Sequence, residues 1–240
     1  MDAFPLAVIE QQWNERQLAE PVRQPAWRLW RYRQPMVVLG CSQRRLLASA
    51  DEAACAPMLV RESGGGAVLT GPWMLGLSVA LPADHPLVGG GPVGSYRWLG
   101  ERIARVLQEA GLEGAHAIAP ERLRASVASH GAGSSDGIEW ACFGGLSPWE
   151  VLAADGRKIV GLAQVRRRNG VLLVGGALLT PSPWSLLCQA LVRPDSDAHR
   201  LARVTTSCRD EIGPSFDALA LERSVGKALE AHLAHETCLY

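Results

Sequence analysis

The amino-acid sequence predicts one α+β domain over residues 1–240, with a mixed, largely antiparallel sheet and helices packed against it. Three observations lead to this prediction. Residues 74–81 and 158–166 alternate their side chains with the period of two that is typical of β-strands. Other segments carry apolar side chains three and four positions apart, as amphipathic helices do. No internal repeat and no linker divides the chain, so we expect a single domain.

The composition restricts the classes of protein to which the chain can belong. A length of 240 residues with 48% hydrophobic side chains is enough to bury one good core. The 24 basic side chains equal the 24 acidic ones, so no overall positive field points to nucleic acid. No apolar run has the length of a membrane span, and the N-terminus lacks the pattern of a secretory signal. The six scattered cysteines contain no CxxC pair, so we predict reduced thiols, a cytoplasmic location and no metal site.

The chain begins with a predicted helix and two short strands. Leu6, Ile9 and Trp13 have helical spacing, and the helix stops before Pro21 because proline cannot continue it. Residues 27–39 then indicate two short strands that are interrupted by the tripeptide RQP.

A glycine-rich loop and a strand follow, and the rest of the chain is arranged around them. Three consecutive glycines, 64–66, precede residues 75–81, in which the odd-numbered positions are all apolar. Such a loop can direct several N–H groups at a carboxylate or a phosphate. The spacing matches neither the GxGxxG dinucleotide motif nor the GxxxxGK[ST] phosphate loop. The alternative is a hairpin turn in which the glycines serve geometry alone.

A second helix and a loop lead to the next motif. Ser95 is expected to cap the helix and Gly111 to end it. The buried stripe of this helix is expected to contain Leu99, Ile103, Val106, Leu107 and Ala110. Residues 124–139 are small and polar, so we predict a mobile loop that leads directly into Cys142.

The strand that begins at Lys158 has two different faces. The face that should pack on the core holds Ile159, Gly161, Ala163 and Val165. The other face mixes aliphatic side chains with a few polar ones, which is typical of an apolar cavity: Lys158, Val160, Leu162, Gln164 and Arg166. The alternative is an ordinary strand with a solvated face.

The last third of the chain predicts a hairpin and two helices. Residues 166–170 indicate a turn and residues 171–179 its return strand. A helix is expected from Ser182 to the residue before Pro194. The final helix is expected to bury Val225, Leu229 and Leu233 on one stripe.

Two of these segments together resemble the family of lipoate–protein ligases, octanoyltransferases and biotin–protein ligases. The family carries an R-x-x-GGG-x-V loop that runs into a strand, and later a G-[KR]-K-[IVL]-x-G-x-A-Q strand. The matching positions are Arg61, Gly64, Gly65, Gly66 and Val68, then Gly156, Lys158, Gly161, Ala163 and Gln164. The segments around Gln43 and over 203–213 are similar as well. The resemblance therefore covers nearly the whole chain and implies a biotin/lipoate ligase-like catalytic domain.

The resemblance also implies a catalytic pair and an acyl-binding wall. Lys158 matches the lysine that contacts the acyl carbonyl in the family, a task for which a compact charge with three donors is suited. Cys142 is placed where the cysteine-using members carry their nucleophile, although a small hydrophobe in the core is the alternative. The implied acyl-binding residues are Arg61, Ser63, Gly64, Gly65, Gly66, Ala67, Ser78, Gly161, Ala163 and Gln164.

Three functions are compatible with this resemblance. The first is a cysteine-dependent acyltransferase that attaches an octanoyl or lipoyl group to a lysine of lipoyl carrier domains and needs no cofactor. The second is an ATP-dependent lipoate–protein ligase that forms a lipoyl-adenylate with ATP and Mg and does not use Cys142. The third is a non-catalytic acyl-binding relative.

The implied partners are acidic proteins. They are a lipoyl carrier domain, of the glycine-cleavage or 2-oxoacid dehydrogenase type, and an acyl carrier protein. The arginines at 166–168 either steer the docking of such a partner or form a solvated hairpin tip. Neither nucleic acid nor a membrane is implied.

Several positions depart from the family pattern. Leu69 and Thr70 follow the glycines where many members have histidine, and Gly76 replaces a common asparagine. Val174 replaces a histidine that is often found on the return strand. These differences argue against histidine-assisted acid/base catalysis. The GRGR signature of biotin ligases is also missing, which argues against biotin as the substrate.

Overall fold

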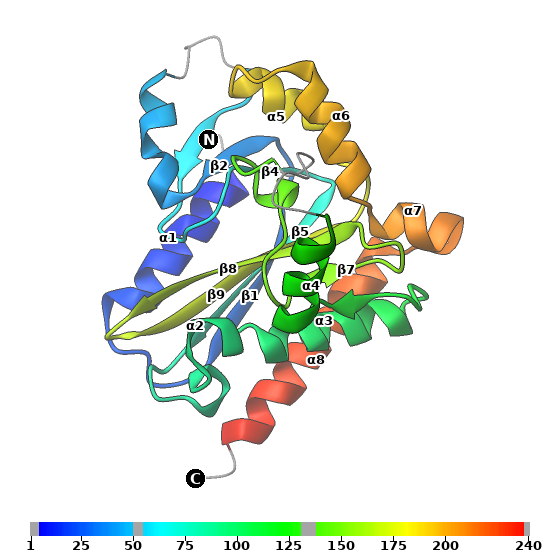
Figure 1. The fold of residues 1–240 in the computed structure, drawn as a ribbon. Helices are drawn as coiled ribbons and strands as arrows, with labels where there is room; N and C mark the ends of the chain where they lie inside the picture. Colours follow the sequence, from blue (N-terminus) through cyan, green and yellow to red (C-terminus); the bar gives the residue numbers. More distant parts are fainter. Residues whose placement is uncertain (1–4, 50–54, 131–137, 238–240) are drawn as a thin grey trace.

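The computed structural model describes residues 5–49, 55–130 and 138–237, which form two sheets and their covering helices (Figure 1). The larger sheet has six strands in the order β1-β5-β9-β8-β7-β6, and every neighbouring pair is antiparallel. These strands are β1 (Ala26–Arg31), β5 (Met74–Leu81), β9 (Gly170–Leu178), β8 (Lys158–Arg167), β7 (Val151–Leu152) and β6 (His116–Ala117). The predicted hairpin of β8 and β9 is therefore present.

A smaller sheet of three strands has the order β3-β2-β4. Its members are β2 (Met36–Leu39), β3 (Met58–Val60) and β4 (Val68–Thr70). Strand β3 runs parallel to β2, whereas β4 runs antiparallel to it. The predicted α+β class, with mixed and largely antiparallel sheets, is confirmed. The extent of the single domain over residues 1–240 stays a prediction.

Helices cover both faces of the larger sheet, as Figure 1 shows. The α-helices are α1 (Leu6–Ala19), α2 (Gly91–Gly94), α3 (Arg97–Glu109), α4 (Pro120–His130), α5 (Trp184–Ala190), α6 (Asp195–Val204), α7 (Cys208–Ile212) and α8 (Ala218–Thr237). The 3₁₀ helices are η1 (Cys41–Ser49), η2 (Pro86–Val88), η3 (Cys142–Gly144) and η4 (Gly213–Ser215). Among the described residues, no helix is both long and apolar enough to cross a membrane.

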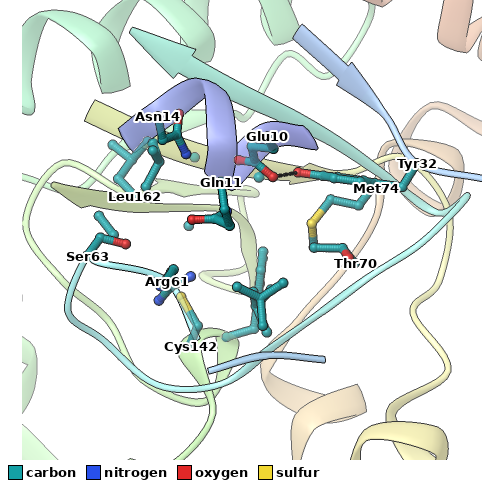
Figure 2. Close-up of a pocket in the computed structure, with 18 residues that line it drawn as sticks. Glu10, Gln11, Asn14, Tyr32, Arg61, Ser63, Thr70, Met74, Cys142 and Leu162 are labelled. Atoms are coloured by element: carbon teal, nitrogen blue, oxygen red, sulfur yellow. Dashed lines mark hydrogen bonds between the residues drawn. The ribbon is translucent and has the colours of Figure 1, made fainter. Parts of the chain in front are cut away.

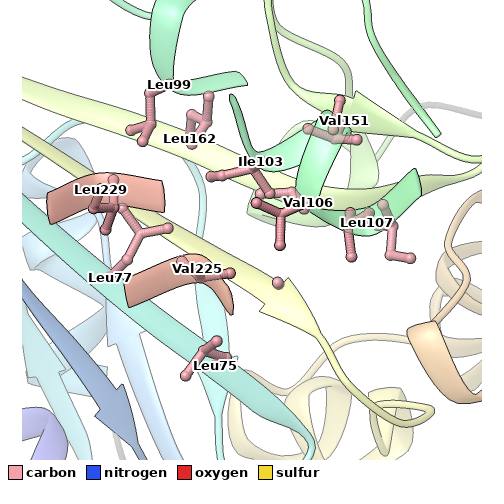
Figure 3. Close-up of a cluster of buried hydrophobic side chains, with 14 of the residues drawn as sticks. Leu75, Leu77, Leu99, Ile103, Val106, Leu107, Val151, Leu162, Val225 and Leu229 are labelled. Carbon is pink, nitrogen blue, oxygen red and sulfur yellow. The ribbon is translucent and has the colours of Figure 1, made fainter. Parts of the chain in front are cut away.

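The main core lies between the larger sheet and helices α3 and α8 (Figure 3). The odd-numbered positions of β5 point into this core, as the alternation predicts, and Leu75 and Leu77 are almost completely buried. The stripes predicted for both helices are confirmed, with Ile103 of α3 and Val225 of α8 in the same cluster. Burial of such side chains stabilises the fold by about 1.5–3 kcal/mol each. The core therefore fixes β5, whose opposite face is turned toward α1.

Helix α1 covers that opposite face with an unusual set of buried side chains. Its most buried positions are Ala7, Glu10, Asn14 and Leu18. Two of these four side chains are polar, while Leu18 packs on Ala80 of β5 and on the return strand. A helix that directs a carboxyl and an amide inward indicates that this face does more than pack against the sheet.

Two local predictions are wrong. Ser95 does not cap α3, because α2 ends there and α3 begins at Arg97; the Ser95 hydroxyl donates instead to the carbonyl of Pro92. The first part of the loop predicted at 124–139 is helical, because α4 continues to His130. Residues 131–137 lie outside the described residues.

From Val160 onward the two faces of β8 are the reverse of the predicted ones, whereas Ile159 lies in the main core as predicted. Val160 and Leu162 belong to the core with α3 and α8, whereas Gly161 and Ala163 face a pocket on the side of α1, which Leu162 also borders. Over residues 159–163 both faces of this strand carry apolar or small side chains, so alternation alone cannot decide which of them meets the helices. The residues with the smaller side chains face the pocket and leave space there.

Candidate active site

A pocket lies between α1, the larger sheet and the glycine-rich loop (Figure 2). Residues from the first helix, from both sheets and from η3 meet in it. Its lining consists of Glu10, Gln11, Asn14, Tyr32, Val38, Arg61, Ser63, Val68, Thr70, Met74, Cys142, Phe143, Gly161, Leu162, Ala163, Val174, Gly175 and Gly176. Mostly apolar walls with a few polar side chains are typical of a site for a small organic ligand.

Three glycines in register form part of the sheet surface below this pocket. Gly76 of β5 is directly opposite Gly176 of β9, which is directly opposite Gly161 of β8. Neighbouring strands lie about 4.8 Å apart, so this glycine row extends for roughly 10 Å across the sheet. Cys142 lies over the Gly161 end of the row, and Tyr32 lies over the Gly76 end. Between these two side chains the thioether of Met74 covers the middle glycine, Gly176, so a narrow chain fits along the row if Met74 moves aside.

The glycine-rich loop positions the backbone of Cys142. Ala67 donates its N–H to the carbonyl of Trp140 over 2.8 Å and accepts the N–H of Cys142 over 2.8 Å. A Cβ on Gly66 would lie 2.6 Å from the carbonyl carbon of Ala141 and 2.7 Å from the nitrogen of Cys142. Gln43 braces the same segment by donating to the carbonyl of Trp140 over 2.8 Å. The close approach of two chain segments thus explains why a glycine is needed at position 66.

The side chain of Arg61 bridges two carbonyls of the glycine-rich loop and borders the pocket. Its guanidinium donates from one nitrogen to the carbonyls of Gly64, over 2.9 Å, and Gly66, over 3.1 Å. Gly65 between them has a φ of +92°, which favours glycine. Among the described residues, the Nε of Arg61 has no hydrogen-bond partner although the side chain is buried. A buried donor without a partner at a pocket wall is available to an anionic or carbonyl group of a ligand.

Lys158 is buried next to Cys142 but does not line the pocket. Its ammonium lies 2.7 Å from a carboxylate oxygen of Glu150, and the exposed fraction of either side chain is at most 2%. It also donates to the carbonyls of Cys142, over 2.7 Å, and Gly145, over 3.0 Å. An ammonium has three protons, so these three acceptors satisfy it completely. Lys158 therefore anchors the Cys142 segment. Its ammonium can contact an acyl oxygen only if that oxygen replaces one of the three acceptors.

Glu150 is a functional candidate that the sequence analysis missed. Besides Lys158, its carboxylate accepts the N–H groups of Ser147, over 2.7 Å, and Leu162, over 3.1 Å. It therefore joins strand β8 to the turn that follows Cys142. The available signal was a single acidic residue directly before the apolar residues of β7, because a charge in such a place needs a buried partner.

A second buried carboxyl, that of Glu10, lies at the far end of the pocket. The hydroxyl of Tyr32 donates to Glu10 over 2.7 Å, and Figure 2 shows this pair on the side of the pocket away from Cys142. Burial raises the pKa of the Glu10 carboxyl from 4.5 to about 7, against the opposing effects of the Tyr32 hydrogen bond and the Arg61 charge. Burial and the nearby carboxylate raise the pKa of Tyr32 well above its ordinary value.

The other predicted site residues are divided between the pocket and its surroundings. Ser63 and Ala163 line the pocket together with Arg61, Cys142 and Gly161. Ser78 is buried beside the pocket and accepts a hydrogen bond from the indole of Trp30 over 3.0 Å. Gln164 is not in the pocket, because its side chain lies on the opposite face of the sheet and is bound to Ser95 and Pro92.

Of the cysteines that the structure describes, Cys142 is the one that lines the pocket. Cys41 and Cys55 are exposed, and Cys188 and Cys208 are buried elsewhere. Burial raises the pKa of the Cys208 thiol to about 12, which keeps it protonated at neutral pH. Cys238 lies outside the described residues.

Similarity to known proteins agrees with this geometry. A family described as the lipoyl protein ligase A/B catalytic domain matches residues 3–230. Octanoyltransferase LipM of Kyrpidia tusciae is 29% identical over 210 residues, which are 85% of this chain and 73% of the relative. Octanoyltransferase LipM of Moorella thermoacetica is also 29% identical, over 88% of this chain and 71% of the relative.

Solved structures show the same fold. Protein Ta0514 of T. acidophilum, with bound lipoic acid, has a TM-score of 0.63 at 16% identity and covers 95% of this chain and 80% of its own. Lipoate-protein ligase A bound with ATP has a TM-score of 0.61 at 18% identity, over 95% of this chain and 79% of its own. The family inferred from the glycine loop and the lysine strand is confirmed: the chain belongs to the lipoyl protein ligase A/B catalytic domain family.

Proposed function

We propose that this enzyme is an octanoyltransferase that acts on lipoyl domains and carries the acyl group on Cys142. The observation that supports this best is the place of the thiol, 3.6 Å from the position that a Cβ of Gly161 would occupy in the pocket. The similar LipM proteins are named octanoyltransferases. A T. acidophilum lipoate protein ligase of the same fold was analysed together with its E2 lipoyl domain.

The proposed reaction has two acyl-transfer steps. In the first, the Cys142 thiolate attacks the acyl carbonyl carbon, the bond to the donor's sulfur or nitrogen breaks, and the donor leaves with a proton. In the second, the neutral amine of the acceptor lysine attacks the thioester carbonyl. The thiolate of Cys142 leaves, the amine loses a proton, and an amide remains on the lipoyl domain.

Two cations in the site assist these steps in different ways. Each tetrahedral intermediate carries a negative oxygen that must be stabilised. Arg61 borders the pocket and has a buried donor that no described residue engages, so it is placed to meet an acyl oxygen. Lys158 holds the carbonyl of Cys142 and thereby fixes the direction from which the thiol attacks.

The proposal also includes the protein partners of the two acyl-transfer steps. The acceptor is an acidic lipoyl domain of the glycine-cleavage or 2-oxoacid dehydrogenase type, and an acyl carrier protein is a candidate donor. Of the arginine tip, Arg166 donates to the carbonyl of Val88 over 3.1 Å and Arg167 pairs with Glu62 over 2.7 Å. Arg168 is exposed and is the member of the tip that we assign to docking.

The second candidate is an ATP-dependent lipoate–protein ligase, which the fold shared with an ATP-bound ligase favours. This reaction would need ATP and Mg, whereas the transferase needs no cofactor. Exchange of label between pyrophosphate and ATP in the presence of lipoate supports the ligase. Its absence, with acyl transfer present, supports the transferase.

Mass spectrometry of the intact enzyme tests the first candidate. We expect a hydroxylamine-sensitive octanoyl adduct on the peptide that contains Cys142 after incubation with an octanoyl thioester. Cys142→Ser should lose the adduct and the transfer while keeping its melting temperature, since the two side chains are nearly isosteric. Cys41→Ser, at an exposed position, is the matched control and should retain both. Transfer by wild type and Cys142→Ser at equal rates, without an adduct, would contradict the proposal.

A further inference from the structure

The side chain of Tyr32 closes one end of the pocket. An added Cβ at Gly76 would overlap the hydroxyl and ring of Tyr32, so this side chain fills the space above the last glycine of the row. Cys142 lies above the first glycine, Gly161. Strands β8 and β5 are both neighbours of β9, so the two ends are separated by two strand spacings, roughly 10 Å. This separation is close to the length of an extended octanoyl chain.

The end formed by Tyr32 is rigid. Its hydroxyl donates to Glu10 over 2.7 Å, and both side chains have an exposed fraction of 6%. Moving the ring away would leave a buried carboxyl without this donor, which is costly in an apolar surrounding. Glu10 is itself held by helix α1, which packs on the sheet through Leu18 and Ala80.

The middle of the glycine row is adaptable instead. The thioether of Met74 lies above Gly176, where an added Cβ would approach its sulfur to 2.8 Å. Methionine is unbranched and adjusts its shape to its neighbours at little cost. The side walls here include Val38 and Val68, which are apolar. An acyl chain can therefore pass along the row and displace Met74, but it cannot pass Tyr32.

We propose that Tyr32, held by Glu10, is the wall that sets the length of the acyl chain, so that the site accepts straight chains up to octanoyl and rejects longer ones. This inference rests on the proposed function for the attachment of the chain to Cys142. The binding of free fatty acids tests the length of the pocket without any transfer step.

Isothermal titration calorimetry with butanoate, hexanoate, octanoate, decanoate and dodecanoate gives the affinity as a function of chain length, which we call the length profile. For the wild type we expect affinity to rise about fourfold per buried methylene up to octanoate and then to fall. Tyr32→Ala should move the maximum to decanoate or dodecanoate and increase the affinity for dodecanoate by at least about tenfold. Tyr32→Phe keeps the ring and should keep the maximum at octanoate, but it should lower the melting temperature because Glu10 loses its donor.

A second variant covers the case in which Tyr32→Ala does not fold. Gly176→Ala inserts a methyl group midway along the row, against the flexible end of Met74. It should weaken the binding of octanoate by at least about tenfold and leave the binding of butanoate unchanged. Gly94→Ala is the matched control, because no atom in the described part of the chain lies within 4 Å of an added Cβ there.

Several outcomes would overturn the inference. They are a folded Tyr32→Ala variant with the wild-type profile, a Gly176→Ala variant that binds octanoate normally, and a wild type that binds none of the acids. A wild type with the expected profile but without an adduct on Cys142 would leave the length inference standing. It would then be the proposed transferase reaction that fails.

Discussion

Lys158 carries its charge in a place that water does not reach, so we expect it to support the structure as well as the proposed chemistry. Removing one partner of a buried ion pair typically costs about 3–5 kcal/mol, because the other charge remains without compensation. We therefore expect Lys158→Met to lose acylation of Cys142 and also to lower the free energy of unfolding by about that amount. The double variant Lys158→Met with Glu150→Gln should recover much of the stability but none of the activity.

Urea unfolding and the rate of acylation, measured on both variants, separate these two roles. Glu101→Gln, at an exposed position on α3, is the control for loss of a carboxylate at the surface and should leave both quantities nearly unchanged. Equal stability of the single and double variants would show that Glu150 does not depend on Lys158. Full activity of either variant would remove Lys158 from the mechanism.

At the scale of elements, the glycine loop acts by letting two chain segments approach each other. Gly66→Ala should displace Ala141 and Cys142, because the added Cβ has no space there. A misplacement of about 1 Å can cost about 100-fold in rate, so we expect acylation of Cys142 to fall at least about tenfold. Gly64→Ala is the matched control, since an added Cβ at Gly64 meets no atom of the described residues within 4 Å.

The rate of acylation, measured in reactions that are quenched at set times, and the melting curves of the two variants check this prediction. Gly64→Ala should melt close to the wild type, whereas Gly66→Ala should melt somewhat lower but stay folded, because Ala141 belongs to a second buried cluster and the core between β5 and its helices is untouched. If Gly64→Ala is impaired as strongly as Gly66→Ala, the loop matters as a ligand surface and not as a support for Cys142. If neither variant is impaired, the proposed support is wrong.

The same loop shows what could be predicted from the sequence and what could not. Local patterns identified the loop, strand β5, the hairpin of β8 and β9, and the family. They did not show that Gly66 meets Ala141, because that contact joins segments about 75 positions apart and depends on how the chain folds. The faces of β8 from Val160 onward were reversed for a related reason: over residues 159–163 both carry apolar or small side chains, and only the helices that cover the sheet distinguish them.

For the whole molecule, buried polar residues were the hardest to predict. Glu10 and Asn14 lie on an ordinary helical pattern, and nothing in their spacing says that this face turns inward. The roles of Tyr32 and Glu150 depend on their bonding partners, which come from other elements. A sequence pattern records the period of an element, whereas the pairing of two charges or two hydrogen-bonding groups is a property of the assembled fold.

The buried carboxyl of Glu10 makes the stability of the whole molecule depend on pH. Its pKa is about 7 in the folded protein and 4.5 in an unfolded chain, so the folded state binds more protons between these values. Stability from this group is therefore present below about pH 4.5 and is lost as the pH rises through 7. The loss amounts to about 3 kcal/mol when the carboxyl is fully ionised. Glu10→Gln keeps an acceptor for Tyr32 but cannot ionise.

Urea unfolding of the wild type and of Glu10→Gln, from about pH 5 to about pH 8, checks this prediction. The difference in unfolding free energy between the variant and the wild type should increase with pH in favour of the variant. It should approach about 3 kcal/mol at the alkaline end, because the wild type alone must then ionise a carboxyl that is shielded from water. Other titrating groups are common to both proteins and cancel in the difference. Parallel stability curves would mean that Glu10 ionises in the folded protein as it does in water, and that its burial against Tyr32 is not maintained in solution.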